Sequence, residues 1–192
     1  MLVGDEFPVM LSPAVMLPPG TGPRHGAFFP TTGKAQFYYL VGELARTVTA
    51  YSVTYEPRSL VLEELQTVLA IPEASGSKSL TGEIAISPDG KFVYVSNRFD
   101  TMFPETGTSA ITLYSRKESG ELKEEGFFDS GVVTPRHITI DPTGQWFVAS
   151  GQDSGDVKVY RRDAVTGKVG GAVGTLRVPG GAVSVTWARG PE

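Results

Sequence analysis

Short apolar stretches with polar residues at every second position recur along the chain of 192 residues. The strings IAIS, FVYVS, ITLYS and VKVYR have the period of two that is typical of a β-strand with two unlike faces. Three segments, which begin near Arg24, Gly82 and Arg136, share one layout of four such stretches. The pattern predicts repeated four-stranded antiparallel meanders of about 50 residues each.

The turns between these strands repeat as well. Proline presets φ in a tight turn, and glycine supplies the positive φ that other residues avoid. The shared positions are Pro30, Pro88 and Pro142, then Gly33, Gly90 and Gly144, and finally Tyr51, Tyr114 and Tyr160 at the third strands. Sheets of this length are typical of propeller blades, of which a closed ring has roughly four to eight. We predict an all-β β-propeller with blades at residues 24–78, 79–133 and 134–181.

The number of repeats predicts an incomplete ring. Residues 1–23 are interpreted as the outer strand of a preceding blade, and residues 182–192 as the innermost strand of a further blade. An open arc exposes apolar faces and strand edges, so we expect either a fragment of a longer protein or self-association through the open blade edges. A β-sandwich and an amphipathic helix over Leu60–Leu69 are the alternatives for the fold.

Composition excludes several classes of function. Without cysteine the chain has no disulfide, thiolate zinc site or cysteine nucleophile. The net charge is −4 and the basic residues are scattered, so we expect no nucleic-acid partner. No apolar run approaches the roughly 20 residues that span a membrane, and the N-terminus lacks the basic region of a signal peptide. We therefore expect a cytoplasmic protein with no membrane association. Two distant histidines do not define a zinc site, and no nucleotide-binding fingerprint occurs, so we expect no metal and no cofactor.

Polar and ionisable residues occupy matching positions of the three repeats: five residues before each turn proline, and at the end of each second strand. Because strands one and two form an antiparallel hairpin, both positions lie at one rim, and the innermost strands of a propeller line its channel. The members are His25, Glu83 and His137 in the first position, Glu43, Arg98 and Gln152 in the second, and Arg24 and Arg136 beside them. Acid, base and cation around one cavity indicate acid–base chemistry on an anionic substrate. The alternative is that these residues only satisfy backbone groups or meet solvent.

Two loops carry weaker signals. Asp153 and Asp156 in QDSGD have too few oxygen ligands nearby for a calcium site, so a solvated turn is the favoured interpretation. Residues 104–107 (PETG) lie in a long insertion of the second repeat, which we interpret as a mobile loop near the channel mouth.

Three strings resemble the lactonase family of seven-bladed propellers: GPRH from Gly22, GEIAISPDGKFVYVSNR from Gly82, and TPRHITIDPTGQWFVASGQDS from Thr134. That family includes the propeller-type 6-phosphogluconolactonases and the fungal carboxy-cis,cis-muconate cyclase. The resemblance covers nearly the whole chain and corresponds to the C-terminal half of the family's propeller. It implies a site of His, Glu and Arg at the channel mouth without an obligatory metal. The chain departs from the family at Glu43, where Gly42-Glu43-Leu44 stands in place of the usual Asn-Glu-Leu.

The repeat positions and the resemblance together give one leading hypothesis, the hydrolysis of a sugar-acid lactone. Its catalytic residues are expected to be His25, Glu43, Glu83 and Arg98, and its substrate-binding residues Arg24, Arg136, His137 and Gln152. Glu43 or His25 would act as general base, while Arg98 and Arg24 would hold the anionic group and stabilise the oxyanion. The alternatives are a muconate-lactonising cyclase and a non-catalytic propeller that serves as a binding scaffold.

Overall fold

The computed structural model describes residues 15–56, 59–72 and 75–188. Within these ranges the chain folds into three antiparallel sheets, each with four strands in sequence order and no α-helix between them. The first sheet contains β1 (Pro23–Phe29), β2 (Phe37–Gly42), β3 (Thr47–Glu56) and β4 (Ser59–Leu69). The second contains β5 (Leu80–Ile86), β6 (Phe92–Arg98), β7 (Ala110–Arg116) and β8 (Leu122–Asp129). The third contains β9 (Pro135–Ile140), β10 (Trp146–Gly151), β11 (Asp156–Arg162) and β12 (Val169–Arg177).

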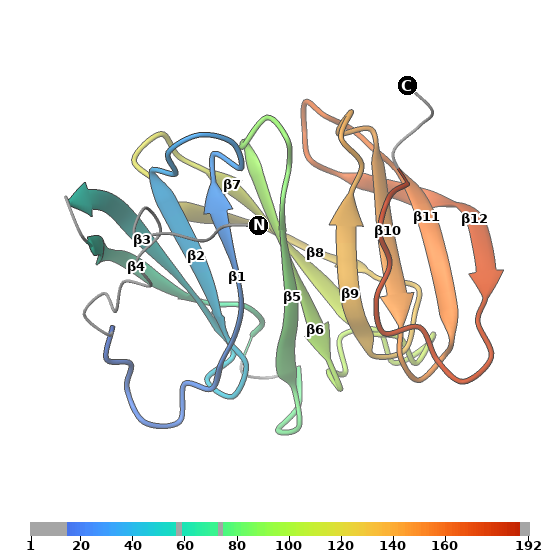
Figure 1. Cartoon of the computed structure of the whole chain (residues 1–192). Coiled ribbons are helices and arrows are strands. Elements are labelled where there is room, and N and C mark those ends of the chain that lie inside the picture. The colour runs from blue at the N-terminus through green and yellow to red at the C-terminus, as the bar shows by residue number, and fades with distance from the viewer. Residues whose placement is uncertain (1–14, 57–58, 73–74, 189–192) are drawn as a thin grey trace, which may run out of the picture.

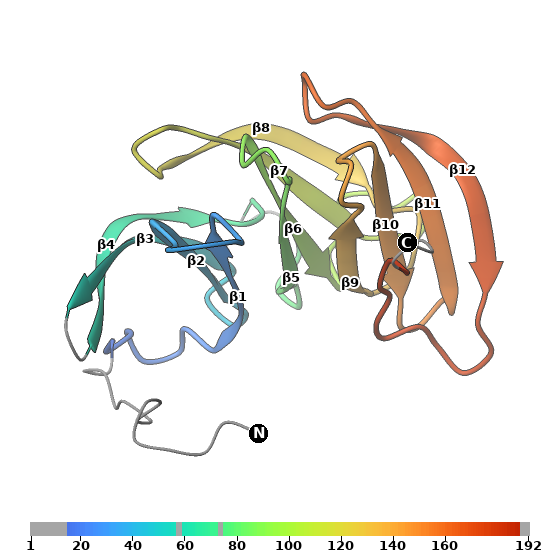
Figure 2. The ribbon, with the colours of Figure 1, turned by 45° about the horizontal axis from the view of Figure 1, so that its top comes forward.

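The predicted all-β propeller architecture is confirmed by these sheets. Leu60–Leu69 lies in β4, so the helix alternative is wrong. The sheets fan out as an open arc, with β1, β5 and β9 on the inner side and β4, β8 and β12 on the outer side (Figures 1 and 2). Strand β5 contacts both β1 and β9, which brings the innermost strands side by side.

The sheets pack face to face through two apolar cores, as the alternation in the sequence requires. Tyr39, Val41 and Val48 of the first sheet meet Val93 and Val95 of the second. The opposite face of the second sheet packs through residues of the same strands onto the third sheet, with the members Tyr94, Ile111, Leu113, Ile138, Phe147 and Tyr160. Each apolar residue of a strand is thus committed to one neighbouring sheet, which fixes the register of the strands.

Tyrosine hydroxyl groups tie neighbouring sheets together in a repeated way. Tyr39 donates to the carbonyl of Gly120 in the next sheet, at 2.8 Å, and Tyr94 donates to that of Gly167. Burial raises the pKa of both phenols to about 12, despite the opposing effects of Arg116 on Tyr39 and Arg162 on Tyr94. Both hydroxyl groups therefore remain neutral donors at physiological pH.

A second set of tyrosines points back to the preceding sheet. Tyr114 donates to the carbonyl of Leu69 at 2.7 Å, and Tyr160 donates to that of Ser130. Tyr51 is the matching residue of the first sheet, but its buried hydroxyl group donates to no carbonyl of the described residues.

The tight turns form where the sequence predicts them. Gly33, Gly90 and Gly144 have φ values of 75°, 67° and 74°. A Cβ atom at position 90 would also lie 2.0 Å from the ring of Phe29, so this position excludes any other residue unless the ring moves. These turns connect β1 to β2, β5 to β6 and β9 to β10. They lie at the end of each sheet that is opposite the predicted polar rim.

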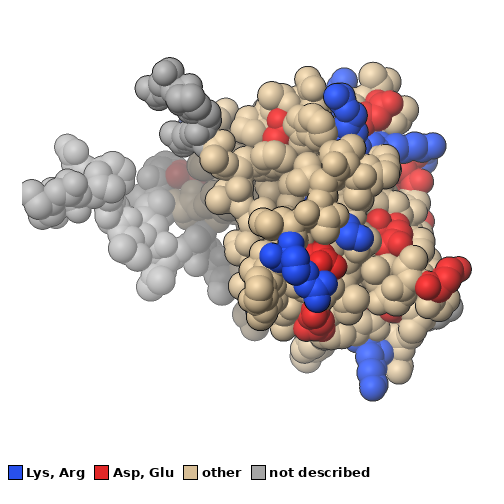
Figure 3. Space-filling model, turned by 90° about the vertical axis from the view of Figure 1, so that its right-hand side faces the viewer, with Lys and Arg blue, Asp and Glu red and all other residues tan. Residues whose placement is uncertain are grey.

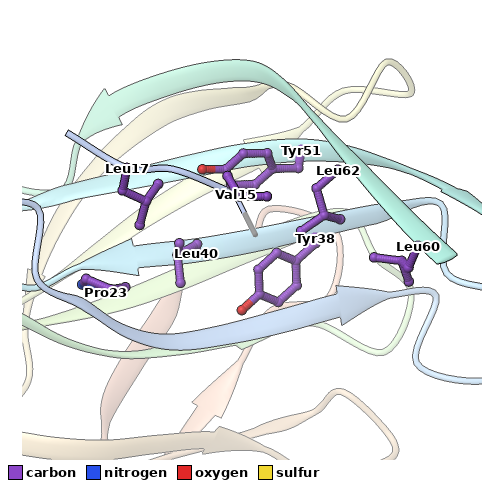
Figure 4. Close-up of a pocket in the computed structure, with 8 residues that line it drawn as sticks. All are labelled: Val15, Leu17, Pro23, Tyr38, Leu40, Tyr51, Leu60 and Leu62. Carbon is purple, nitrogen blue, oxygen red and sulfur yellow. The ribbon is translucent and has the colours of Figure 1, made fainter. Parts of the chain in front are cut away.

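The outward faces of the arc are largely uncharged. On the first sheet, Tyr38, Leu40, Tyr51, Leu60 and Leu62 line a hollow of about 360 Å³, with Val15, Leu17 and Pro23 beside them (Figure 4). On the β12 side the surface is mostly uncharged, with charged side chains in scattered groups (Figure 3). Residues 181–188 form no strand. The assignment of this segment to a further blade stays a prediction, and the preceding-blade strand lies mainly outside the described residues.

Candidate active site

Irregular pairing at the start of each innermost strand shapes the candidate site. The register of β1 with β2 shifts between Pro23 and Gly26, and that of β5 with β6 between Thr81 and Ile84. The pairing of β9 with β10 shifts at Ser150 and Gly151, so that it skips Arg136. A bulge redirects side chains that would alternate between the faces of a regular strand. For this reason sequence neighbours such as Arg24 and His25 line the same cavity.

Glu83 of β5 stands between two histidines from the neighbouring sheets. Its Oε1 lies 3.2 Å from Nδ1 of His25, and its Oε2 lies 3.6 Å from Nε2 of His137. Glu83 is only 7% exposed, and its Oε1 also accepts the backbone N–H of Ile84 at 3.1 Å. The backbone N–H of Glu83 donates to Oγ of Ser96 at 2.8 Å. The carboxylate is therefore fixed, with an imidazole on either side of it and the closer contact to His25.

The two histidines are not equivalent. The side chain of His25 is 45% exposed, and its contact with Glu83 uses Nδ1, which leaves Nε2 on the other side of the ring. The side chain of His137 is 28% exposed and uses Nε2 toward Glu83, while its Nδ1 is buried without a hydrogen-bond partner among the described residues. Only His25 therefore combines an oriented ring with an accessible second nitrogen.

Glu43, just after β2, bridges two arginines. Its Oε2 accepts from Nη1 of Arg24 at 3.2 Å, and its Oε1 accepts from Nη2 of Arg98. Partial burial raises the pKa of Glu43, but the hydrogen bond from Arg98 and the charges of Arg24 and Arg98 outweigh it and lower the pKa below its ordinary value. The Arg98 side chain is 5% exposed and also donates to the carbonyl of Thr81 at 3.2 Å. Glu43 is therefore an ionised partner of both cations.

Arg136 of β9 has a neutral partner instead. Its Nη1 donates to Oε1 of Gln152 at 2.8 Å. Among the described residues no carboxylate forms an ion pair with this guanidinium. Arg136 is near enough to Arg98 for its charge to lower the pKa of that arginine, although burial of Arg98 is the larger cause.

The predicted residues divide into two groups. A cavity of about 400 Å³ is lined by Arg24, His25, Glu83, Arg136 and His137. Glu43, Arg98 and Gln152 contact these residues or one another behind the cavity wall. The innermost strands and the ends of the second strands thus bring all eight predicted residues into one cluster, although the roles assigned to them stay predictions.

Val183 and Ser184 also line the cavity, and sequence reasoning did not name them. Their position in the repeat could have indicated them. They fall in a segment predicted as an innermost strand, and His25, Glu83 and His137 also lie in innermost strands. Neither residue has an ionisable side chain, so neither was among the predicted acid–base or charged groups.

The weaker signals have structural explanations. Asp153 accepts a hydrogen bond from Thr134, and Asp156 pairs with Arg177 at 2.9 Å. The insertion around residues 104–107 is tied to the outer strand β8, where Thr106 donates to Asp129. In the described part of the chain, no group of three or more His, Asp or Glu side chains is arranged to hold a metal ion. The same residues include no helix with the length and apolarity needed to cross a bilayer.

Comparison with known proteins gives consistent matches. The chain is 45% identical over 167 residues to a probable 6-phosphogluconolactonase of Arthroderma benhamiae. The matched residues cover 86% of this chain and 41% of that protein. It is 34% identical to the 6-phosphogluconolactonase of Bacillus subtilis, over 84% of this chain and 43% of the relative. Its structure is similar to that of the periplasmic gluconolactonase PpgL of Pseudomonas aeruginosa, with a TM-score of 0.75, 27% identity, and coverage of 88% and 43%.

The chain spans less than half the length of these relatives. The model of the family described as "Lactonase, 7-bladed beta-propeller" matches residues 6–187, which is nearly the whole chain. The expectation drawn from the three strings that begin at Gly22, Gly82 and Thr134 is therefore confirmed: this chain belongs to the lactonase family of seven-bladed β-propellers.

Proposed function

We propose that this chain carries the catalytic rim of a hydrolase that opens a sugar-acid lactone by general acid–base chemistry. The observation that carries the proposal is the Glu83–His25 contact of 3.2 Å at the wall of a cavity that arginines also line. An imidazole oriented by a carboxylate is a recurrent arrangement for proton transfer at a reacting centre. The similarity to proteins named as lactonases supports the same substrate class.

His25 is a better general base than Glu43, the other candidate. A base must accept a proton from water, and Glu43 is held in its ionised form by two arginines, which lower its pKa. Histidine takes up and releases protons near neutral pH. With Nδ1 of His25 facing Glu83, its Nε2 is free to accept a proton from water in the cavity.

Arg24 is the cation placed to stabilise the oxyanion. It lines the cavity beside His25, and its Nη1 is fixed by Glu43 at 3.2 Å. A fixed charge aimed at a developing oxyanion is among the largest contributions to acyl-transfer catalysis. Arg98 does not line the cavity, so we assign to it the role of holding Glu43, and through Glu43 the guanidinium of Arg24.

The proposed hydrolysis needs only water, the lactone, His25 and Arg24. Water attacks the lactone carbonyl carbon while Nε2 of His25 takes one water proton, and the carbonyl oxygen becomes an oxyanion next to Arg24. Collapse of this intermediate breaks the ring C–O bond. The leaving alkoxide takes the proton back from the imidazolium, which yields the hydroxy acid and restores neutral His25.

The test is lactone hydrolysis followed by acid release at constant pH. The chain is assayed alone and fused behind the N-terminal blades of the Arthroderma benhamiae relative, with the 6-phosphate of glucono-1,5-lactone and with glucono-1,5-lactone itself as substrates. We expect turnover in the fusion that is lost in its His25→Gln variant. A folded fusion that hydrolyses neither lactone, or one whose turnover does not depend on His25, contradicts the proposal and favours a binding scaffold.

The remaining expectations about the setting are also proposals. The cytoplasmic location stays a prediction, since one structural relative is named as periplasmic. Self-association through the open blade edges stays a prediction as well, and the oligomeric state in solution would test it.

A further inference from the structure

The first and third sheets carry the same arginine arrangement with one chemical difference. Arg24 and Arg136 occupy matching positions at the start of β1 and β9, each one residue before a histidine. Each donates through Nη1 to a side chain at the end of the second strand of its own sheet. That acceptor is the carboxylate of Glu43 in the first sheet and the amide oxygen of Gln152 in the third. The geometry is repeated while the charge of the acceptor is not.

This difference leaves the positive charge of Arg136 without a carboxylate partner at the cavity wall. Glu43 pairs with both Arg24 and Arg98, and Glu83 lies between the two histidines. Gln152 fixes the Arg136 guanidinium by a hydrogen bond but offers no negative charge. An arginine that is fixed but not neutralised has the features of an anion-binding group, because its position is set and its charge is available.

We propose that Arg136, positioned by Gln152, is the anchor for the anionic tail of the substrate and sets a preference for a phosphorylated lactone over an uncharged one. Arg136 lines the cavity together with His25 and Arg24. The cavity volume of about 400 Å³ is within the range of small-molecule sites, which is roughly 300–1,000 Å³. One ligand can therefore lie with its carbonyl at His25 and its phosphate at Arg136. The identity of the ring as a lactone rests on the proposed function, whereas the binding of an anion at Arg136 does not.

The sharpest variant is Gln152→Glu, which keeps an oxygen acceptor of the same reach and adds the negative charge that the first sheet already has. Arg136→Met removes the cation itself, and Arg136→Lys keeps the charge but not the planar fork. Gln145→Glu is the matched control, because it makes the same chemical change in the same sheet. Gln145 is exposed in the turn before β10, at the opposite end of the hairpin from Gln152.

Binding of 6-phosphogluconate and of gluconate is measured by calorimetry at one fixed salt concentration, since salt screens such contacts. The two ligands differ only in the phosphate, so the ratio of their Kd values isolates the anchor from the rest of the site. We expect the chain, alone or in the fusion, to prefer the phosphorylated ligand by about 10- to 100-fold, the usual worth of hydrogen bonds to a charged group. In Gln152→Glu and Arg136→Met the preference should fall to about 3-fold or less, while Arg136→Lys keeps part of it and Gln145→Glu all of it.

Other results overturn the proposal. Equal affinity for both ligands in the unmodified protein, or no binding in either form, excludes a phosphate anchor. An unchanged ratio in folded Gln152→Glu and Arg136→Met proteins places the anchor elsewhere. A protein that keeps the ratio but hydrolyses no lactone would retain the anchor and refute the proposed function, so the two failures are distinguishable.

Discussion

The rims of the first and third sheets are built on one plan and carry unlike electrostatics. In both, a bulged innermost strand presents an arginine and a histidine to the cavity, and the end of the second strand holds the arginine. Glu43 gives Arg24 of the first rim an anionic partner, whereas Gln152 gives Arg136 of the third rim only a neutral one. A repeat protein can thus form an asymmetric site. The fold places side chains at matching positions of each sheet, and a change of residue type at one position alters the charge there.

The two histidines give the largest expected difference between these rims. His25→Gln should lower kcat for lactone hydrolysis by about 10²- to 10⁴-fold, because it removes the general base. His137→Gln should cost about 10-fold or less, since the accessible nitrogen belongs to His25 and not to His137. Steady-state kinetics of the two variants side by side measure the contrast. Equal losses would mean that the rims share the proton transfer.

Removing the charge of Glu43 should destabilise the chain. Glu43→Gln leaves buried Arg98 without its anionic partner, and we expect the free energy of unfolding to fall by about 2 kcal/mol. This is less than the ~3–5 kcal/mol for a fully buried pair, since Glu43 is partly exposed to solvent. Urea unfolding followed by circular dichroism measures the loss. A change below about 0.5 kcal/mol would show that solvent compensates Arg98.

The same variant has a pH dependence of defined sign. The folded chain lowers the pKa of Glu43 from its ordinary value of 4.5, so the carboxylate stabilises the fold fully above that value. This contribution is lost as the pH falls through the lower pKa of the folded state. The difference in Tm between the wild type and Glu43→Gln should therefore be largest near neutral pH and shrink in acid. A difference that grows in acid would mean that the pKa is raised instead.

The matched tyrosines give the smallest effect and test what lies against the first sheet. Tyr114→Phe removes the hydrogen bond to Leu69 and should cost about 1 kcal/mol of stability. Tyr51→Phe should cost close to nothing in the isolated chain, because the Tyr51 hydroxyl has no carbonyl partner there. In the fusion its cost should approach that of Tyr114→Phe. The same small value in both forms would show that no blade packs through Tyr51.

The apolar hollow of the first sheet has the residue pattern of a surface that packs against another sheet. Tyr38 and Leu40, which line it, match Val93 and Val95 of the second sheet by position in the repeat. The latter pack in the core between the first and second sheets. An outward face with the pattern of a packed interface is thus the surface that a preceding blade would cover.

Much of the fold could be predicted because each sheet is a local unit. Alternation fixed which residues face each neighbour, and the turn glycines at 33, 90 and 144 marked the hairpins. The open ends were harder: residues 181–188 have an apolar pattern but form no strand. A strand needs a partner for its backbone groups, and the pattern alone does not show whether one is present.

The membership of the site was predictable, but its internal division was not. Matching positions identified His25, Glu83 and His137 because the repeat brings them to one rim. The bulges that place Arg24 beside His25 depend on local backbone geometry, which alternation does not encode. The pairing of Glu43 with two arginines, which favours His25 as the base, also depends on distances between strands that are far apart in sequence.

A crystal structure of the fusion with the reaction product 6-phosphogluconate bound would locate both ends of the ligand in the cavity. We expect the product carboxylate next to Nε2 of His25 and the guanidinium of Arg24, and the phosphate on Arg136. A product bound in the reverse orientation, or bound outside the cavity between β1, β5 and β9, would contradict it.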